Sequence, residues 1–268
     1  MSDFNNYNNY NNYNNDSGNY SSYVDNYDDS LNNGSQSGFG MGETTSYYFQ
    51  SLVDTSAVIK KAFGLMVIAL VITAIGAFVT PPETAISMMS GGSYFILILA
   101  ELGLVFVSNY AIRNNNVILA GILYAVYSFV TGMTFSVLAL VYTGSSITSV
   151  FLITSATFAI MCIYGYTTNA DLSSIGNICI MGLLGLIIAT VVNMVFLHSA
   201  GISLVLSYVG VLLFVGLTAY DVQKIKNTSE TVGEDNENAL ALYGAFQLYL
   251  DFINLFLKLL RILGKRRR

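Results

Sequence analysis

Charged residues are scarce in this 268-residue chain, at 10% of the total, whereas soluble proteins average about 25%. Hydrophobic residues make up 54%. They gather in runs of about 20 residues, the length at which a helix crosses the hydrocarbon core of a bilayer. The runs lack the alternating polar pattern of barrel strands. The sequence therefore predicts an all-α integral membrane protein and excludes a soluble globular domain.

Histidine and cysteine are also rare. His198 is the only histidine, which excludes a metal cluster built on imidazoles. Cys162 and Cys179 lack the number and spacing of a disulfide framework or a zinc site, and we interpret them as small buried residues. The chain also lacks a Ser/His/Asp set, a phosphate-binding glycine loop and a nucleic-acid-binding patch. We therefore expect no enzyme activity, no cofactor and no nucleic-acid partner.

Residues 1–50 form a low-complexity tail that opens with an Asn-Asn-Tyr repeat. The first 59 residues hold seven acids and no Lys or Arg, and no basic segment followed by an apolar one marks a secretory signal. Such Asn/Tyr-rich tracts are disordered and prone to self-association. We predict a disordered cytosolic tail, with a self-association or tethering segment as the alternative. The membrane domain would span residues 51–264, followed by a basic end at 265–268.

Seven apolar segments follow the tail, and we expect each to form a transmembrane helix. Pro81 and Pro82 close the first segment, because proline cannot continue a helix. The segments are Val58–Thr80, Ser93–Arg113, Val117–Tyr142, Ile147–Tyr166, Ile178–His198, Ile202–Ile225 and Ala239–Leu263.

The Lys/Arg bias of the short loops predicts the orientation of the bundle. Basic residues flank the start of the first segment and the ends of the second and sixth, which places the N-terminus in the cytosol: Lys60, Lys61, Arg113, Lys224 and Lys226. Seven crossings would place residues 265–268 outside, against the same rule. Either the last segment crosses despite these charges, or it re-enters and returns to the cytosolic side. The basic end would be attracted to anionic lipid.

Three carboxyl groups lie inside apolar segments: Glu101, Asp221 and Asp251. A carboxylate at the bilayer centre costs about 2.5–3.5 kcal/mol on insertion scales, so such residues face a bundle interior or a water-filled path. Asp221 and Asp251, on consecutive helices, indicate proton or cation chemistry. Glu101 either lines an ion path or is a structural acid that a neighbouring helix satisfies. Asp171, in the loop after the fourth segment, either caps the next helix or offers a carboxylate to the path.

Other residues of these segments are interpreted as packing groups. Gly182 and Gly185 would allow close approach of a neighbouring helix. Tyr220 and Tyr249, beside the two aspartates, would be packing aromatics. Lys258 and Arg261 would extend to the membrane interface, or either could neutralise a carboxylate.

Four motifs resemble the Bax inhibitor-1/YccA family, also called the transmembrane Bax inhibitor motif family, over residues 60–264. They are Tyr142-Thr-Gly-Ser-Ser, Tyr164-Gly-Tyr-Thr-Thr-Asn-Ala-Asp-Leu-Ser, Ala219-Tyr-Asp-Val-Gln-Lys-Ile and Leu248-Tyr-Leu-Asp-Phe-Ile-Asn-Leu-Phe-Leu-Lys-Leu-Leu-Arg. The resemblance is to bacterial members and implies a protein of the bacterial cytoplasmic membrane. It also implies a seven-helix transmembrane bundle with the last helix central, and a pH-sensitive calcium leak.

In that family a pair of aspartates on the last two helices senses the proton, and they match Asp221 and Asp251. An arginine at the cytosolic end of the second helix is implicated as partner of the first aspartate, and Arg113 occupies that region to within about one residue. Calcium would be the transported ion. It takes six to eight oxygen ligands, so Asp221 and Asp251 alone would hold it weakly.

Two other functions compete with the leak. Bacterial members of the family are associated with restraint of a membrane-bound protease and eukaryotic members with suppression of cell death, so a regulatory membrane partner is the alternative. Two aspartates on adjacent helices also resemble an intramembrane aspartyl protease. That class carries Gly-x-Gly-Asp at its second acid, whereas Leu248-Tyr-Leu precedes Asp251. The missing glycines argue against proteolysis.

Overall fold

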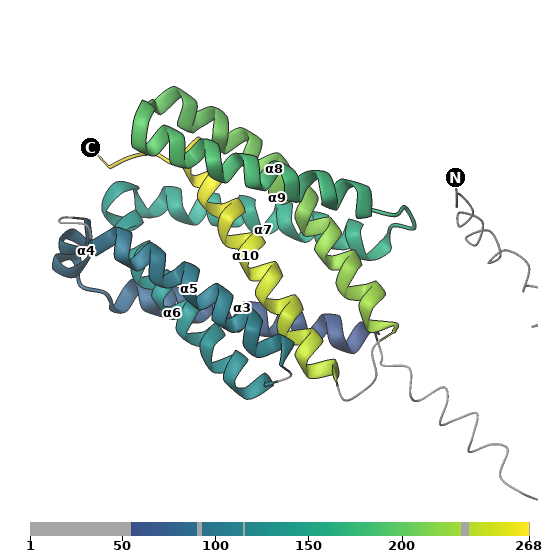
Figure 1. Cartoon of the computed structure of the whole chain (residues 1–268). Coiled ribbons are helices and arrows are strands. Elements are labelled where there is room, and N and C mark those ends of the chain that lie inside the picture. The colour runs from purple at the N-terminus through teal and green to yellow at the C-terminus, as the bar shows by residue number, and fades with distance from the viewer. Residues whose placement is uncertain (1–54, 90–92, 115, 232–235, 268) are drawn as a thin grey trace, which may run out of the picture. The chain divides into compact units, whose positions relative to one another are not determined.

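A computed structural model describes residues 55–89, 93–114, 116–231 and 236–267, and the low-complexity tail predicted over residues 1–50 lies outside them. The described part is all-α, as predicted (Figure 1). Its helices in chain order are α3 (Thr55–Val79), α4 (Pro82–Met89), α5 (Ser93–Arg113), α6 (Val117–Val141), α7 (Gly144–Thr167), α8 (Ser173–Val192), the π-helix η1 (Asn193–Leu197), α9 (Ala200–Ser229) and α10 (Glu237–Leu263).

Six of the described helices are long and apolar enough to cross a membrane: α3, α6, α7, α8 extended by η1, α9 and α10. The protein is therefore a multi-pass membrane protein. The second expected segment is α5, which has 21 residues and is not among the six. The count of seven crossings stays a prediction.

Proline ends the first long helix where the sequence predicts it. α3 stops at Val79, and the next helix, α4, begins with Pro82. The first position of a helix suits proline, because the N–H that proline lacks would have no intrahelical partner there. Glu83 follows in the first turn of α4, where a negative charge is favourable. The short helix α4 was not expected from the sequence.

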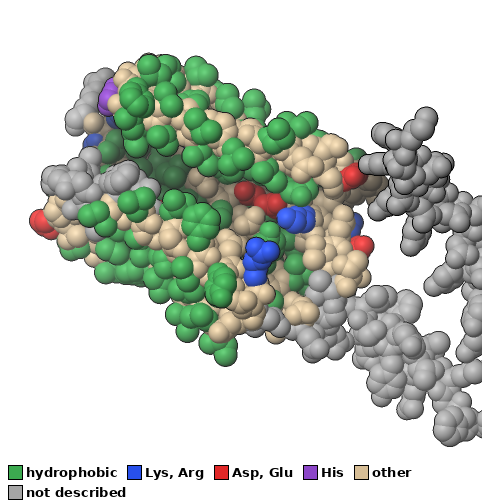
Figure 2. All heavy atoms as spheres, in the orientation of Figure 1, with side chains coloured by type: hydrophobic (Ala, Val, Ile, Leu, Met, Phe, Trp, Pro, Cys, Tyr) green, Lys and Arg blue, Asp and Glu red, His purple; other side chains and the backbone are tan. Residues whose placement is uncertain are grey.

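Apolar side chains cover the outer face of the bundle (Figure 2) and form most of its interior, where several polar side chains are also buried. Ser128, Thr154 and Thr218 are fully buried. Each hydroxyl donates to the carbonyl four residues earlier on its own helix. These groups are thus satisfied without water, as the interior of a membrane requires.

The last helix, α10, is central, as the resemblance implies. It runs through the middle of the bundle (Figure 1) and contacts α3, α5, α6, α7 and α9. Within its most apolar 18-residue window 67% is buried, against 17–33% in the other five candidate spans. A charged residue on this helix therefore either lies at one of its ends or is surrounded by neighbouring helices, which must then accommodate the charge.

α10 does not re-enter. It is continuous over 27 residues, and the chain beyond it pairs with the turn between α6 and α7. The Thr143 N–H donates to the Lys265 carbonyl at 3.1 Å, and the Arg267 N–H donates to the Val141 carbonyl at 2.8 Å. The basic end therefore lies at the end of the bundle opposite the α9–α10 connection (Figure 1).

Two helix crossings depend on glycine. A Cβ atom on Gly132 of α6 would lie 2.2 Å from the Thr73 carbonyl oxygen of α3. A Cβ atom on Gly165 of α7 would lie 2.2 Å from the Ala219 carbonyl oxygen of α9. The prediction for Gly185 is wrong, because a Cβ there would meet nothing within 4 Å. The prediction for Gly182 is confirmed, because a Cβ there would lie 2.8 Å from Leu213 Cδ2 of α9. The sequence does not show which face of each helix meets a neighbour, so it could not separate the two glycines.

Candidate functional site

Asp221 and Asp251 come together in the interior of the bundle. Asp221 lies on α9 and is 8% exposed, and Asp251 lies on α10 and is 5% exposed. The two helices pack against each other, and the two carboxyl groups are within hydrogen-bonding reach of one another. The structure thus brings together the two acids that the sequence selects.

The surroundings of this pair supply few donors. The Oδ2 atom of Asp251 is buried and has no N–H or hydroxyl partner among the described residues. A carboxyl group donates a hydrogen bond only when it is protonated. The contact between Asp221 and Asp251 is therefore favourable when they share one proton and repulsive when both are ionised.

Two thiols and one ammonium group interact electrostatically with the pair. Cys162 of α7 and Cys179 of α8 are free and buried, and both interact with the charge of Asp251. Lys224, one turn after Asp221 on α9, interacts with the Asp221 carboxyl. Sequence reasoning used Lys224 only for orientation and missed this contact. The spacing of three residues on one helix was the available signal.

Lys224 is held between two aromatic rings. Its Nζ atom lies 5.8 Å from the ring centroids of both Tyr220 and Tyr243, which is within the range of cation–π attraction. Nζ also donates a 3.5 Å hydrogen bond to the Tyr243 hydroxyl. Tyr243 belongs to α10, so this cation links α9 to α10 close to the carboxyl pair.

Arg113 ends α5 and is exposed. No ion pair or hydrogen bond joins it to Asp221 among the residues that the structure describes. Its predicted role as the partner of Asp221 stays a prediction.

Glu101 is satisfied by a neighbouring helix. The Thr134 hydroxyl of α6 donates a 2.6 Å hydrogen bond to Glu101 Oε1 on α5. A hydroxyl that bonds a carboxylate at this distance makes a charge-assisted hydrogen bond. Of the two alternatives, this contact favours the structural acid over the ion path.

Asp171 lies in the loop before α8 and is exposed. Its Oδ1 atom accepts a 2.9 Å hydrogen bond from the N–H of Ser173, the first residue of α8. Hydrogen bonds from the side chain and backbone of Ser173 hold the pKa of Asp171 below its usual value. The N-cap residue of α8 is Leu172 and not Asp171, so this bond closes the turn just before the helix, and both predicted roles of Asp171 stay predictions.

Gln223, two residues after Asp221, ties the same loop to α9. Its side chain accepts from the Leu172 N–H at 2.9 Å and donates to the Ala170 carbonyl at 2.8 Å. Lys226 donates to the Tyr166 carbonyl at 3.0 Å. Sequence reasoning missed these contacts, which fix α9 against the α7–α8 loop beside the carboxyl pair.

Tyr249, two residues before Asp251, is completely buried. Its hydroxyl lies 2.6 Å from the Thr73 hydroxyl of α3, which also donates toward the Ala69 and Ser128 carbonyls. The rings of Tyr124 and Tyr127 pack edge-on against the Tyr249 ring at 5.7 and 5.9 Å. This aromatic cluster fixes α10 against α3 and α6 just before Asp251.

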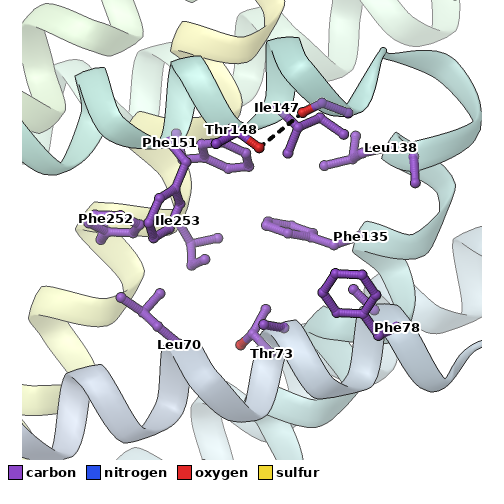
Figure 3. A pocket seen from close by; sticks show the side chains of 15 residues that line it. Leu70, Thr73, Phe78, Phe135, Leu138, Ile147, Thr148, Phe151, Phe252 and Ile253 are labelled. Carbon is purple, nitrogen blue, oxygen red and sulfur yellow. Dashed lines mark hydrogen bonds between the residues drawn. The ribbon is translucent and has the colours of Figure 1, made fainter.

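An apolar cavity of about 350 Å³ lies beside this part of α10, between α3, α6 and α7 (Figure 3). Phe135, Phe151, Phe252 and Phe256 line it together with Thr73. No titratable side chain lines this cavity. It therefore cannot be the polar path on which Asp221 and Asp251 would act.

The pair is the part of the site able to hold a cation. Among the described residues, no group of three or more His, Cys, Asp or Glu side chains is arranged to bind a metal ion. Two carboxylates provide fewer oxygens than calcium requires. The arrangement can exchange a proton and attract a cation weakly.

Residues 55–268 match the protein family described as "Inhibitor of apoptosis-promoting Bax1". The chain belongs to this family. An "Uncharacterized protein" of Borreliella burgdorferi is 43% identical over 223 residues, which cover 81% of this chain and 96% of the relative. The "Inner membrane protein YbhL" of Escherichia coli K12 is 41% identical over 213 residues, covering 77% and 91%.

A third relative, named "Uncharacterized membrane protein", comes from Streptococcus pyogenes serotype M1. It is 36% identical over 172 residues, which cover 64% of this chain and 74% of the relative. The Bax inhibitor family is described by inhibition and not by a catalysed reaction. The names of the Escherichia coli and Streptococcus pyogenes relatives agree with the apolar helices found here: this member is a membrane protein.

Proposed function

We propose that the protein is a pH-sensitive cation leak, with calcium as the transported ion and the Asp221–Asp251 pair as the gate. The observation that carries the proposal is the buried contact between two carboxyl groups on neighbouring helices, where the described residues offer Asp251 Oδ2 no N–H or hydroxyl donor. Such a contact is stable only with a shared proton. The protonation state therefore determines whether α9 and α10 attract or repel each other at this point.

Loss of the shared proton would leave two like charges in a poorly solvated site. Their repulsion there is several times stronger than in water. It can be relieved by separation of α9 from α10 or by entry of a cation between the carboxylates. Two carboxylates bind calcium too weakly to retain it, which supports transient passage over storage.

The contacts around the pair support movement of α9 more than of α10. α10 is buried among five helices and fixed by the Tyr249 cluster before Asp251. Asp221 lies on α9, where Gln223 and Lys226 bind the loop that is cytosol-proximal in the predicted orientation and Lys224 makes one long hydrogen bond to Tyr243 of α10. We infer that α9 tilts at Asp221 while α10 stays in place.

The test is calcium flux into dye-loaded liposomes from pH 5 to 8. We expect wild-type flux to vary with pH and both Asp221→Asn and Asp251→Asn to flatten that dependence. Glu83→Gln, which removes an acid from the first turn of α4 far from the pair in sequence, should keep the wild-type profile. Purified, folded protein that gives no flux above empty liposomes at any pH would exclude the leak.

A second candidate function is regulation of a partner membrane protein, such as a membrane-bound protease. The description of the matched family as an inhibitor favours it. Deletion of residues 1–50 distinguishes the two functions. Flux through the bundle should survive the deletion, whereas regulation through the tail should vanish.

A further inference from the structure

A second cavity, of about 380 Å³ and with polar and charged residues in its lining, lies between the α8–α9 turn and the last turns of α10. Its lining includes two cations, Lys258 and Arg261, with His198, Asn193, Ser199 and Ser203. This volume is within the range of small-ligand sites, roughly 300–1,000 Å³. In Figure 2, the His side chain and Lys/Arg atoms lie near one another at one end of the bundle.

The backbone that closes this cavity departs from regular helix. α8 passes into the π-helix η1, and His198 follows in the left-handed region at φ 49° and ψ 27°. Asn193 holds the turn, because its side chain accepts from the Ser199 N–H at 3.1 Å and donates to the Ser203 hydroxyl at 2.8 Å. π-helices and left-handed non-glycine residues concentrate at functional sites. The turn is thus built and fixed against the cavity.

Among the described residues, no acidic side chain forms an ion pair with either cation. Lys258 and Arg261 are three residues apart on α10, so their charges lie on one face of the helix and repel each other. No Asp or Glu lines the cavity. The single ion pair found within the described ranges joins Lys61 to Glu237 and involves neither cation.

Gly210 of α9 makes room for Lys258. A Cβ atom at Gly210 would lie 3.0 Å from the Cδ and Cε atoms of Lys258. The Lys258 stem therefore lies against bare backbone, and the side chain is half-buried at the cavity. The first turn of α9, from Ala200, lines the same cavity, and a helix N-terminus adds a favourable potential for negative charge.

We propose that this cavity binds a phosphate group. A guanidinium and an ammonium that converge without a carboxylate match the charge and the acceptor oxygens of a phosphate, and the bound anion would end the repulsion between Lys258 and Arg261. The phosphate comes either from an anionic phospholipid headgroup or from free phosphate. This site is separate from the carboxyl pair and does not depend on the leak.

The test is thermal unfolding of the full chain in neutral detergent at constant ionic strength. One series replaces chloride with inorganic phosphate, and another adds phosphatidylglycerol or phosphatidylcholine. Ligands that bind the folded state raise the unfolding temperature by mass action. A rise in the unfolding temperature with inorganic phosphate identifies free phosphate as the ligand. A rise with phosphatidylglycerol alone identifies the lipid headgroup.

Two variants and one control locate the binding. Lys258→Met keeps the stem on Gly210 and removes the charge, and Arg261→Gln removes the exposed cation. Each should raise the apparent dissociation constant for the phosphate ligand about tenfold or more. Arg266→Gln removes a cation at the same end of the bundle that does not line the cavity, and should bind as wild type does. Because Arg261 is exposed, its variant stays informative if Lys258→Met fails to fold.

Three results would overturn the proposal. The first is wild-type protein that neither phosphate nor phosphatidylglycerol stabilises. The second is equal stabilisation of wild type and Arg261→Gln. The third is loss of binding in Arg266→Gln equal to that in Arg261→Gln, which would indicate attraction by the overall charge of this end.

Discussion

Gly165→Ala should destabilise the bundle far more than the same change at Gly185. Both residues lie inside helices, α7 and α8, so both gain about 0.8–1.0 kcal/mol from the better helix propensity of alanine. At Gly185 a Cβ meets nothing within 4 Å, so that gain should remain. At Gly165 the Cβ would lie 2.2 Å from the Ala219 oxygen and 2.9 Å from the Ala219 carbonyl carbon.

The atoms that a Gly165 side chain would meet are all backbone, so no rotamer change relieves the overlap. Overpacking of this kind costs about 1–3 kcal/mol, and we expect the upper end because α7 must move away from α9. With the propensity gain subtracted, Gly165→Ala should lose about 2 kcal/mol of unfolding free energy and Gly185→Ala should gain up to about 1 kcal/mol.

Unfolding from mixed micelles by titration with a denaturing detergent measures both values under one condition. Gly185→Ala is the matched control, because it makes the same chemical change without the overlap. If Gly165→Ala is as stable as Gly185→Ala, the α7–α9 crossing is looser than described here. In that case Ala219 would not position Asp221, which lies two residues further along α9.

Tyr249→Phe removes the hydroxyl that contacts Thr73 and should cost about 1 kcal/mol, measured by the same titration, with Thr73→Val giving a similar loss. Gln223→Leu leaves two loop backbone groups unpaired and should cost about 1–3 kcal/mol, with faster amide exchange in the α7–α8 loop by mass spectrometry; unchanged exchange would contradict the contacts. The pKa of Asp171 is lower than that of a free aspartate. Its bond to Ser173 is therefore fully present at any pH above the usual aspartate pKa and is lost only as the pH falls through the lowered pKa. Asp171→Asn should therefore leave the pH midpoint of flux between pH 5 and 8 unchanged, and a moved midpoint would implicate this carboxyl in gating.

The helices could be predicted because each carries its own signal. An apolar run of about 20 residues forms a helix in a bilayer whatever its neighbours do, since only internal hydrogen bonds satisfy its backbone. The residues at which the helices begin and end were less predictable. α8 begins at Ser173, five residues before the predicted Ile178, because Asp171 and Gln223 satisfy the polar groups of the preceding loop.

The carboxyl pair was predictable because a charge inside an apolar run is rare and costly. Its partners were not. The sequence indicates only an orienting role for Lys224 and leaves two roles open for Glu101, whereas the structure adds the interaction of Lys224 with Asp221 and the Thr134 hydrogen bond to Glu101. Lys258 and Arg261 were read as residues that extend to the interface, whereas the π-helix after α8 closes a cavity over them.

The sequence by itself determined that this is an all-α membrane protein, where its apolar segments lie, and which two carboxyl groups are out of place in them. These are local properties, set by composition and by the cost of placing polar groups in hydrocarbon. Only the tertiary structure decided that Gly165 and not Gly185 is a close crossing, that no described residue gives Asp251 Oδ2 an N–H or hydroxyl donor, and that two cations share one cavity. Those properties depend on which helix faces meet, and that is determined by packing between segments far apart in the chain.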